Sequence, residues 1–239
     1  MSSGAKQLVQ IAKETVIGTV PSPFARQTLA FTDISLNQSV EKTESASIAD
    51  SRLQQSSMIT SAEYSGELGA EAQYGAYDDL MAAAAFNAWA TNVLTFGGTT
   101  RQTFSVLLGY TDIANYHTFS GLHVNTFGID IPEAGLIGLT FGFMGTKRTT
   151  AAVAPVGTIT PASTNPRMSN ISVGDLLVDG ASVKGTACIT AFSFNWDNSM
   201  QVQKCLGAGL EVGAILEMSA KGTGSFTMAW STKAAELYE

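Results

Sequence analysis

Residues Met58 to Glu71 alternate between two kinds of side chain, and this alternation constrains the fold more than any other feature of the sequence. Successive side chains of a β-strand leave opposite faces of the sheet. One face of such a strand carries Met58, Thr60, Ala62, Tyr64, Gly66, Leu68 and Ala70, and the other carries Ile59, Ser61, Glu63, Ser65, Glu67, Gly69 and Glu71. At ~3.3 Å per residue the strand would be about 45 Å long, far beyond an ordinary strand. We therefore predict a long strand with one face that can be buried and one that is solvated and acidic.

A short helix is predicted directly after this strand. A turn at Tyr74-Gly75 is followed by Asp78 and Asp79, and acidic residues are favourable in the first turn of a helix. The helix body, LMAAAAFNAW, contains strong helix formers and has apolar side chains on most sides. We expect it to pack in the chain's own core, against a neighbouring subunit, or both. The side chains expected in this packing are Leu80, Met81, Phe86 and Trp89.

The composition favours a large, ordered β domain and argues against nucleic-acid binding through phosphates. Of 239 residues, 45% are hydrophobic and only 14% are charged, which allows a sizeable core and excludes a disordered chain. The net charge is −7, and lysine and arginine do not cluster. A protein that grips nucleic acid is normally basic, so DNA near this chain should be repelled.

Further strands are predicted from the same alternation of apolar and polar residues. The segments Thr103–Thr111, Gly121–Ile131 and Ala134–Gly145 each place large apolar side chains on one face. Only Pro132 and Glu133 separate the last two segments, which predicts a tight hairpin. The run from Leu210 to Trp230 is predicted to be a second long strand with one solvated face.

Three segments lack a hydrophobic period. Residues 1–27 contain Pro21 and Pro23 and are predicted to form an extended N-terminal arm. Residues 38–51 are polar and residues 146–168 are rich in Thr, Ala and Pro, so both are predicted to be long loops. Because strands of the same character resume after the second loop, we interpret residues 1–239 as one domain.

The residue types that carry catalysis or metal binding are sparse. The only histidines are His117 and His123, which would lie roughly 20 Å apart on one strand, too far to share a metal. The cysteines Cys188 and Cys205 are expected to be free, buried thiols. No nucleophile elbow or phosphate-binding loop is present. The sequence therefore predicts no enzyme, no cofactor and no metal site. It contains no stretch approaching the ~20 apolar residues of a membrane helix.

The carboxylates Glu63, Glu67 and Glu71 share the solvated face of the long strand. They would be spaced roughly 13 Å apart, which is beyond the separation of a paired-acid hydrolase. Two interpretations remain open from the residues alone: an ordinary solvated sheet face, or a stripe that lines a channel in an oligomer.

The chain resembles a known family in three places. These are the G-E-L strand, Tyr-rich turn and Leu/Met/Ala helix of Met58–Trp89, the phrase Lys13–Thr19 followed by Pro21, and the segment FSGLHVNTF at Phe119–Phe127. Taken in their order along the chain, these segments resemble the tail tube (major tail) protein of long, non-contractile-tailed bacteriophages, the siphovirus type.

The resemblance implies a fold and an assembly. The fold would be mainly β, a sandwich- or barrel-like domain with one flanking α-helix. Its long strands would contribute to an inner β-barrel shared by a hexameric ring, and rings would stack into a hollow tube. The protein would be assembled in the host cytoplasm, reside in the virion tail, and contact the tape measure, tail terminator and tail tip proteins.

The resemblance also implies a mechanism, the passive ejection of genomic DNA through the tube. Glu63, Glu67 and Glu71 would then face the lumen as an acidic wall to which DNA does not bind. Two alternatives come from other classes: the tube of a contractile injection or type VI secretion-like system, and a β-sandwich binding module that decorates the tail.

Overall fold

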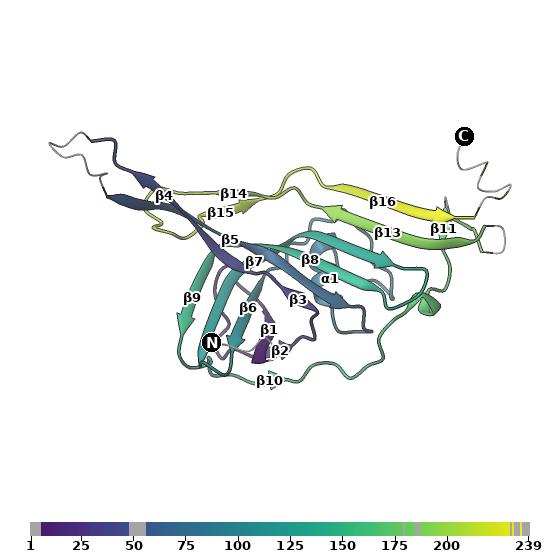
Figure 1. Cartoon of the computed structure of the whole chain (residues 1–239), viewed down its shortest axis with the longest axis horizontal. Coiled ribbons are helices and arrows are strands. Elements are labelled where there is room, and N and C mark those ends of the chain that lie inside the picture. The colour runs from purple at the N-terminus through teal and green to yellow at the C-terminus, as the bar shows by residue number, and fades with distance from the viewer. Residues whose placement is uncertain are drawn as a thin grey trace.

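A computed structural model describes residues 6–47, 56–178, 180–184, 187–229, 231 and 235, and this part of the chain is mainly β-sheet (Figure 1). The helical elements are α1 (Asp78–Ala85) and a 3-10 turn, η2 (Asn170–Ser172). The strands are β1 (Gln7–Lys13), β2 (Arg26–Thr28), β3 (Asp33–Ile34), β4 (Asn37–Glu44), β5 (Ser57–Glu71), β6 (Phe104–Tyr110), β7 (Asn115–Ile131), β8 (Gly138–Gly145), β9 (Lys147–Ala151), β10 (Ile159–Thr160), β11 (Leu177–Val178), β12 (Ala181–Ser182), β13 (Ile189–Asp197), β14 (Gln201–Gln203), β15 (Ala214–Leu216) and β16 (Lys221–Met228).

Strand β7 joins two layers of a sandwich. Its first half pairs with β6 and β9, and its second half pairs with β8 and β13. One layer continues from β6 through β1 and β2 to β10, which is parallel to β2. The other layer has the order β4–β5–β8–β7–β13–β16, with β3 also pairing with β5. Within the described residues the layers do not close into a barrel.

Gly121 lies where β7 passes from one layer to the other. Its φ is +63°, a conformation that L side chains rarely adopt. A Cβ at this position would also lie 2.2 Å from the Thr146 hydroxyl oxygen. A glycine is therefore required where the strand bends and the chain after β8 approaches it closely.

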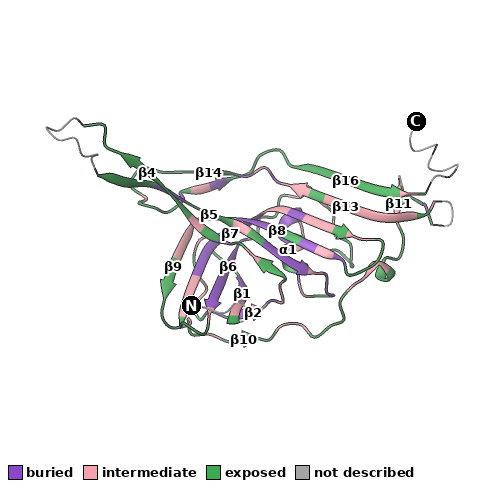
Figure 2. Ribbon diagram, viewed as in Figure 1, coloured by how far each residue is buried: buried purple, intermediate pink, exposed green. Residues whose placement is uncertain are grey.

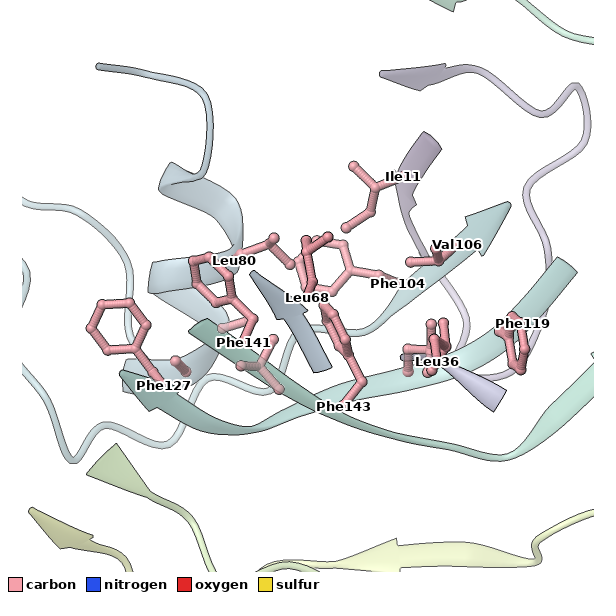
Figure 3. Packing of buried hydrophobic residues seen from close by; sticks show 14 of the residues in the cluster. Ile11, Leu36, Leu68, Leu80, Phe104, Val106, Phe119, Phe127, Phe141 and Phe143 are labelled. Atoms are coloured by element: carbon pink, nitrogen blue, oxygen red, sulfur yellow. The ribbon is translucent and has the colours of Figure 1, made fainter. Parts of the chain in front are cut away.

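The hydrophobic core fills the space between the two layers and beneath α1 (Figure 3). Phe141 of β8 is fully buried near its centre, with ring centroids 6.1 Å from Tyr77 and 5.4 Å from Phe127. Leu68 of β5 and Leu80 of α1 complete this cluster. The predicted inward face of the long strand is thus buried or half-buried from Ala62 to Ala70, whereas Met58 and Thr60 at its start are exposed.

Several predicted elements are confirmed. The long strand is β5, with 15 residues, and the predicted turn contains Gly75 with a φ of +71°. Helix α1 begins at Asp78, as predicted, but it ends at Ala85, four residues before the predicted end at Trp89. Phe86 adopts the left-handed conformation, and its N–H bonds the carbonyls of Ala82 and Ala83, which closes the helix.

The prediction of a loop at residues 38–51 is wrong for the first part of this range. Residues up to Glu44 belong to β4, which pairs with β5 over most of its length, and the end of the predicted loop lies outside the described residues. Most of β4 is exposed on both faces, so its residues show no hydrophobic period. A strand without a buried face cannot be recognised from alternation.

Other boundaries also differ from the prediction. The 1–27 arm contains β1, whose centre is buried between β2 and β6, and the 146–168 loop contains the short strands β9 and β10. A six-residue connection, residues 132–137, replaces the tight hairpin. The second long strand is divided into β15 and β16, which pair with different partners.

Candidate functional site: an acidic sheet face

The layer β4–β5–β8–β7–β13–β16 has one apolar face and one polar face. Cross-strand register places Leu68, Phe141, Phe127 and Trp196 in one row on the core side. The neighbouring positions form rows on the solvent side, and two of these rows are Glu67–Gly142–Thr126–Asp197 and Glu71–Gly138–Asp130–Ser193. Carboxylates from different strands therefore share the solvent side of this layer.

We call this surface the acidic face. Its carboxylates are Asp33, Glu41, Glu63, Glu67, Glu71, Asp130 and Asp197. Small residues occupy many of the positions between them, so the acidic side chains stand above a low sheet surface. A Cβ at residue 69, for example, would lie 2.0 Å from Oδ1 of Asp33, so glycine allows that carboxylate to lie across β5. A shallow cavity of about 430 Å³ lies here, lined in part by Asp33, Glu71 and Asp130.

The three predicted glutamates do share one side of β5, but their partners differ. Glu63 accepts a hydrogen bond from Lys204 Nζ at 3.2 Å, and Glu71 forms an ion pair with Arg167. Glu67 is exposed, and no ion pair to it is found in the described part of the chain. Two of the three carboxylates are thus partly neutralised at exposed sites, where such pairs are weak.

Other strands bring further carboxylates to this face, and these were not predicted from the sequence. Asp33 lies opposite Gly69, and Asp130 and Asp197 lie on β7 and β13. The alternation of each strand contains the necessary signal, because Asp130 lies between the apolar residues Ile129 and Ile131. Which strands are neighbours cannot be read from alternation.

The predicted helix residues have different environments. Leu80 and Phe86 are buried in the chain's own core, and Met81 is partly buried against it. Trp89 is 39% exposed, and its indole N–H donates to the Asp78 carbonyl at 2.9 Å. A contact with a neighbouring subunit remains a proposal, and Trp89 has the most surface available for it.

The histidines and cysteines do not come together. His123 is 1% exposed, its Nδ1 donates to the Gly121 carbonyl at 2.9 Å, and burial lowers its pKa from the ordinary value of 6.5. The described residues contain no group of three His, Cys, Asp or Glu side chains placed to hold a metal ion. Cys188 and Cys205 are free, as expected, but both are exposed, which corrects the prediction of buried thiols. Each lies at the margin of the sheet structure, beyond the core packing.

The sequence matches the model of one protein family over nearly the whole chain. The model of the phage tail tube protein family matches residues 4–239. The chain belongs to the phage tail tube protein family. This is a family of structural tail proteins and not an enzyme family, so the protein is a structural component of the phage tail and hence of the virion.

Among solved structures, chains of other assemblies match part of this tail tube protein. The anti-feeding prophage baseplate, six-fold symmetrised, contains a chain with a TM-score of 0.44 and 13% identity, covering 63% of this chain and 97% of that chain. The sheath–tube complex of an extracellular contractile injection system, PVC, contains a chain with a TM-score of 0.41 and 12% identity, covering 64% of this chain and 93% of that chain. Curated protein sequences give no match. Among the described residues of the tail tube protein, no helix is long and apolar enough to cross a membrane.

Proposed function

We propose that six copies of this tail tube protein close into a ring, and that the rings stack into the hollow tube of a long, non-contractile tail. Genomic DNA would pass through the tube during ejection. The observation that carries this proposal is the pair of unpaired edges at opposite sides of the sheet that bears the acidic face.

Strands β4 and β16 form these edges. Among the described strands, β4 pairs only with β5, and β16 pairs only with β13. Every pairing across β4–β5–β8–β7–β13–β16 is antiparallel, so the two edge strands run in opposite directions. The β16 edge of one copy can therefore pair antiparallel with the β4 edge of the next. Closing the ring would pair both of these edges and produce a shared inner barrel.

The acidic face would then line the lumen. DNA carries a dense negative charge and binds basic surfaces through counterion release, so it would adhere to a basic channel. A wall bearing Glu63, Glu67 and Glu71 together with Asp33, Asp130 and Asp197 would repel DNA and keep it near the axis. DNA would slide through without specific binding, and no cofactor takes part.

Within the virion, the stacked rings would contact the tape measure protein inside the tube, the tail terminator at one end and the tail tip at the other. Assembly would take place in the host cytoplasm. The exposed side of α1 near Trp89 would contribute to contacts between neighbouring copies.

Electron microscopy of the purified protein tests ring closure. We expect six-fold rings or tubes from the wild-type chain, and loss of rings in Val40→Pro, because Val40 is an exposed residue of the β4 edge and proline removes an N–H from it. Val153→Pro, in the exposed connection after β9, is the matched control and should still form rings. A wild-type chain that stays monomeric at high concentration would disprove the proposal, as would normal rings from Val40→Pro.

Imaging of virions separates the alternatives. A sheath around the tube would indicate the alternative of a contractile injection or type VI secretion-like system, which carries protein and not DNA. A monomer or trimer displayed on the outside of the tail would indicate a decorating binding module.

A further inference from the structure

The connection between β14 and β15 carries a fully exposed leucine. Leu206 lies at the tip of this connection, residues 204–213, and is completely open to solvent. Gly207 follows it with a φ of +85°, which turns the chain back directly after the leucine. Leu210, in the same turn, is 39% exposed. The tip therefore presents an apolar side chain on a narrow turn.

The base of this turn is held firmly, so the leucine is a fixed protrusion. The Tyr64 hydroxyl donates to the Leu210 carbonyl at 3.1 Å, and burial raises the pKa of Tyr64, which keeps it a donor. The Val212 N–H donates to the Thr146 carbonyl at 2.9 Å, and the Val212 side chain is buried. Ion pairs Lys204–Glu63 and Lys147–Glu211 flank the turn. Because the turn is already ordered, burying Leu206 against a partner would cost little conformational entropy.

A cavity of about 460 Å³ lies at the start of β13, next to η2 and β12. Its apolar lining includes Ile131, Val173, Leu176, Val183, Ile189 and Phe192. Cys188 also lines it, and Glu133, Asp175 and Lys184 contribute its charged groups. The cavity can accept an aliphatic side chain together with part of the turn that carries it.

The protrusion and the cavity lie at opposite ends of one ribbon. The chain runs from the cavity along β13 and β14 to the turn, then returns along β15 and β16 (Figure 1). In the same view the turn lies beside the projecting β4–β5 hairpin, and the start of β13 lies at the far end of the molecule. A second copy displaced along this ribbon would bring its cavity to the first copy's Leu206. Such a head-to-tail contact does not close on itself, so it can repeat indefinitely.

We propose that Leu206 of one copy docks into the cavity at the start of β13 of a copy in the next ring. The occupant is a second copy of this chain, and the inference rests on the proposed stacking of rings. Lys204, two residues before the leucine, pairs with Glu63 of its own copy at an exposed site where such a pair is weak. In the contact it would turn to Glu133 and Asp175, which outnumber Lys184 around the cavity. From Cys188 in the cavity lining to Leu206 a fully extended chain would span about 60 Å at ~3.3 Å per residue, which sets an upper bound on the spacing of consecutive rings.

Disulfide trapping tests the contact directly, because the cavity already contains Cys188. Leu206→Cys in a Cys205→Ser background would place a thiol of one copy beside Cys188 of the next. Diamide should oxidise the two thiols of assembled tubes to a disulfide and produce a ladder of linked chains on a non-reducing gel. The same variant with Cys188→Ser should give no ladder. Intact tubes that yield only single chains in the first variant would overturn the proposal.

Substitution from both sides of the contact gives an independent readout. Leu206→Asp or Val173→Asp should weaken stacking about tenfold or more, because each places a carboxylate in an apolar contact, while single rings still form. Ile113→Asp, at the exposed β6–β7 turn, is the matched control and should stack normally. Normal tubes from Leu206→Asp would overturn this contact and leave ring closure untouched, whereas absence of wild-type rings would overturn the proposed function itself.

Discussion

The sandwich interior and the two projecting ribbons are built from the same kind of antiparallel sheet, yet only the interior is covered by its own chain. Around Phe141 the strands are packed on one face by the second layer and by α1. The ribbons, β4 with Ser57–Glu63 of β5 and β13–β16, are mostly exposed or half-buried (Figure 2). The interior should therefore determine the stability of the single chain, and the ribbons should determine its assembly.

Matched Phe→Ala substitutions give the sharpest contrast between the two regions. Phe141 is fully buried, so Phe141→Ala should lower the free energy of unfolding by about 3–5 kcal/mol. Phe226 of β16 is 45% exposed, so Phe226→Ala should cost less than about 1 kcal/mol. Denaturant unfolding of the unassembled chain measures both values. Equal costs would contradict the distinction between interior and ribbon.

Glu14 provides the next largest test, because it is a buried carboxylate within the interior region. It accepts hydrogen bonds from the Thr103 and Ser105 hydroxyls and from the Gly18 and Gly121 N–H groups, at 2.6–2.9 Å. Glu14→Gln replaces one accepting oxygen by an NH₂ group that faces donors, and should cost about 2–4 kcal/mol. The control is Glu67→Gln on the exposed acidic face, which should change the melting temperature little. If the two substitutions lower the stability equally little, the contrast between the buried interior and the exposed face would be contradicted.

His123 makes the interior sensitive to acid. Burial lowers its folded-state pKa below the ordinary 6.5, so the unfolded chain binds the proton more readily. Its contribution to stability is complete above about pH 6.5 and is lost as the pH falls through that value toward the lowered folded pKa. The loss should not exceed about 1.4 kcal/mol per pH unit. His123→Gln should flatten the pH dependence of the free energy of unfolding between pH 7 and 5. An unchanged slope would show that other groups cause the acid sensitivity.

The smallest effect on the stability of the single chain, and the largest on transport, is expected at the acidic face. Replacing Glu63, Glu67 and Glu71 together by Lys should change the free energy of unfolding by no more than about 2 kcal/mol, since the two ion pairs that are lost are exposed. Tubes should still form, but genome ejection should slow or stop because DNA would adhere to the wall. The triple Gln variant separates loss of negative charge from gain of positive charge. Unchanged ejection in the Lys variant would show that these residues do not line the lumen.

The sequence alone determined the local elements that have a buried face. The alternation of Met58–Glu71 gave β5, and Asp78 and Asp79 marked the first turn of α1. These predictions succeeded because an element buried on one side repeats its apolar residues with a fixed period. The same reasoning failed for β4, which is exposed on both faces and was predicted to be a loop.

Only the tertiary structure decided which strands are neighbours. Register brings Asp33, Asp130 and Asp197 to the face of Glu67, and chain crossings bring Lys204 to Glu63 and Arg167 to Glu71. It also places Leu206 and the cavity at opposite ends of one ribbon. The physical reason is that side-chain periodicity reports burial along one strand, whereas pairing depends on contacts between residues far apart in the sequence.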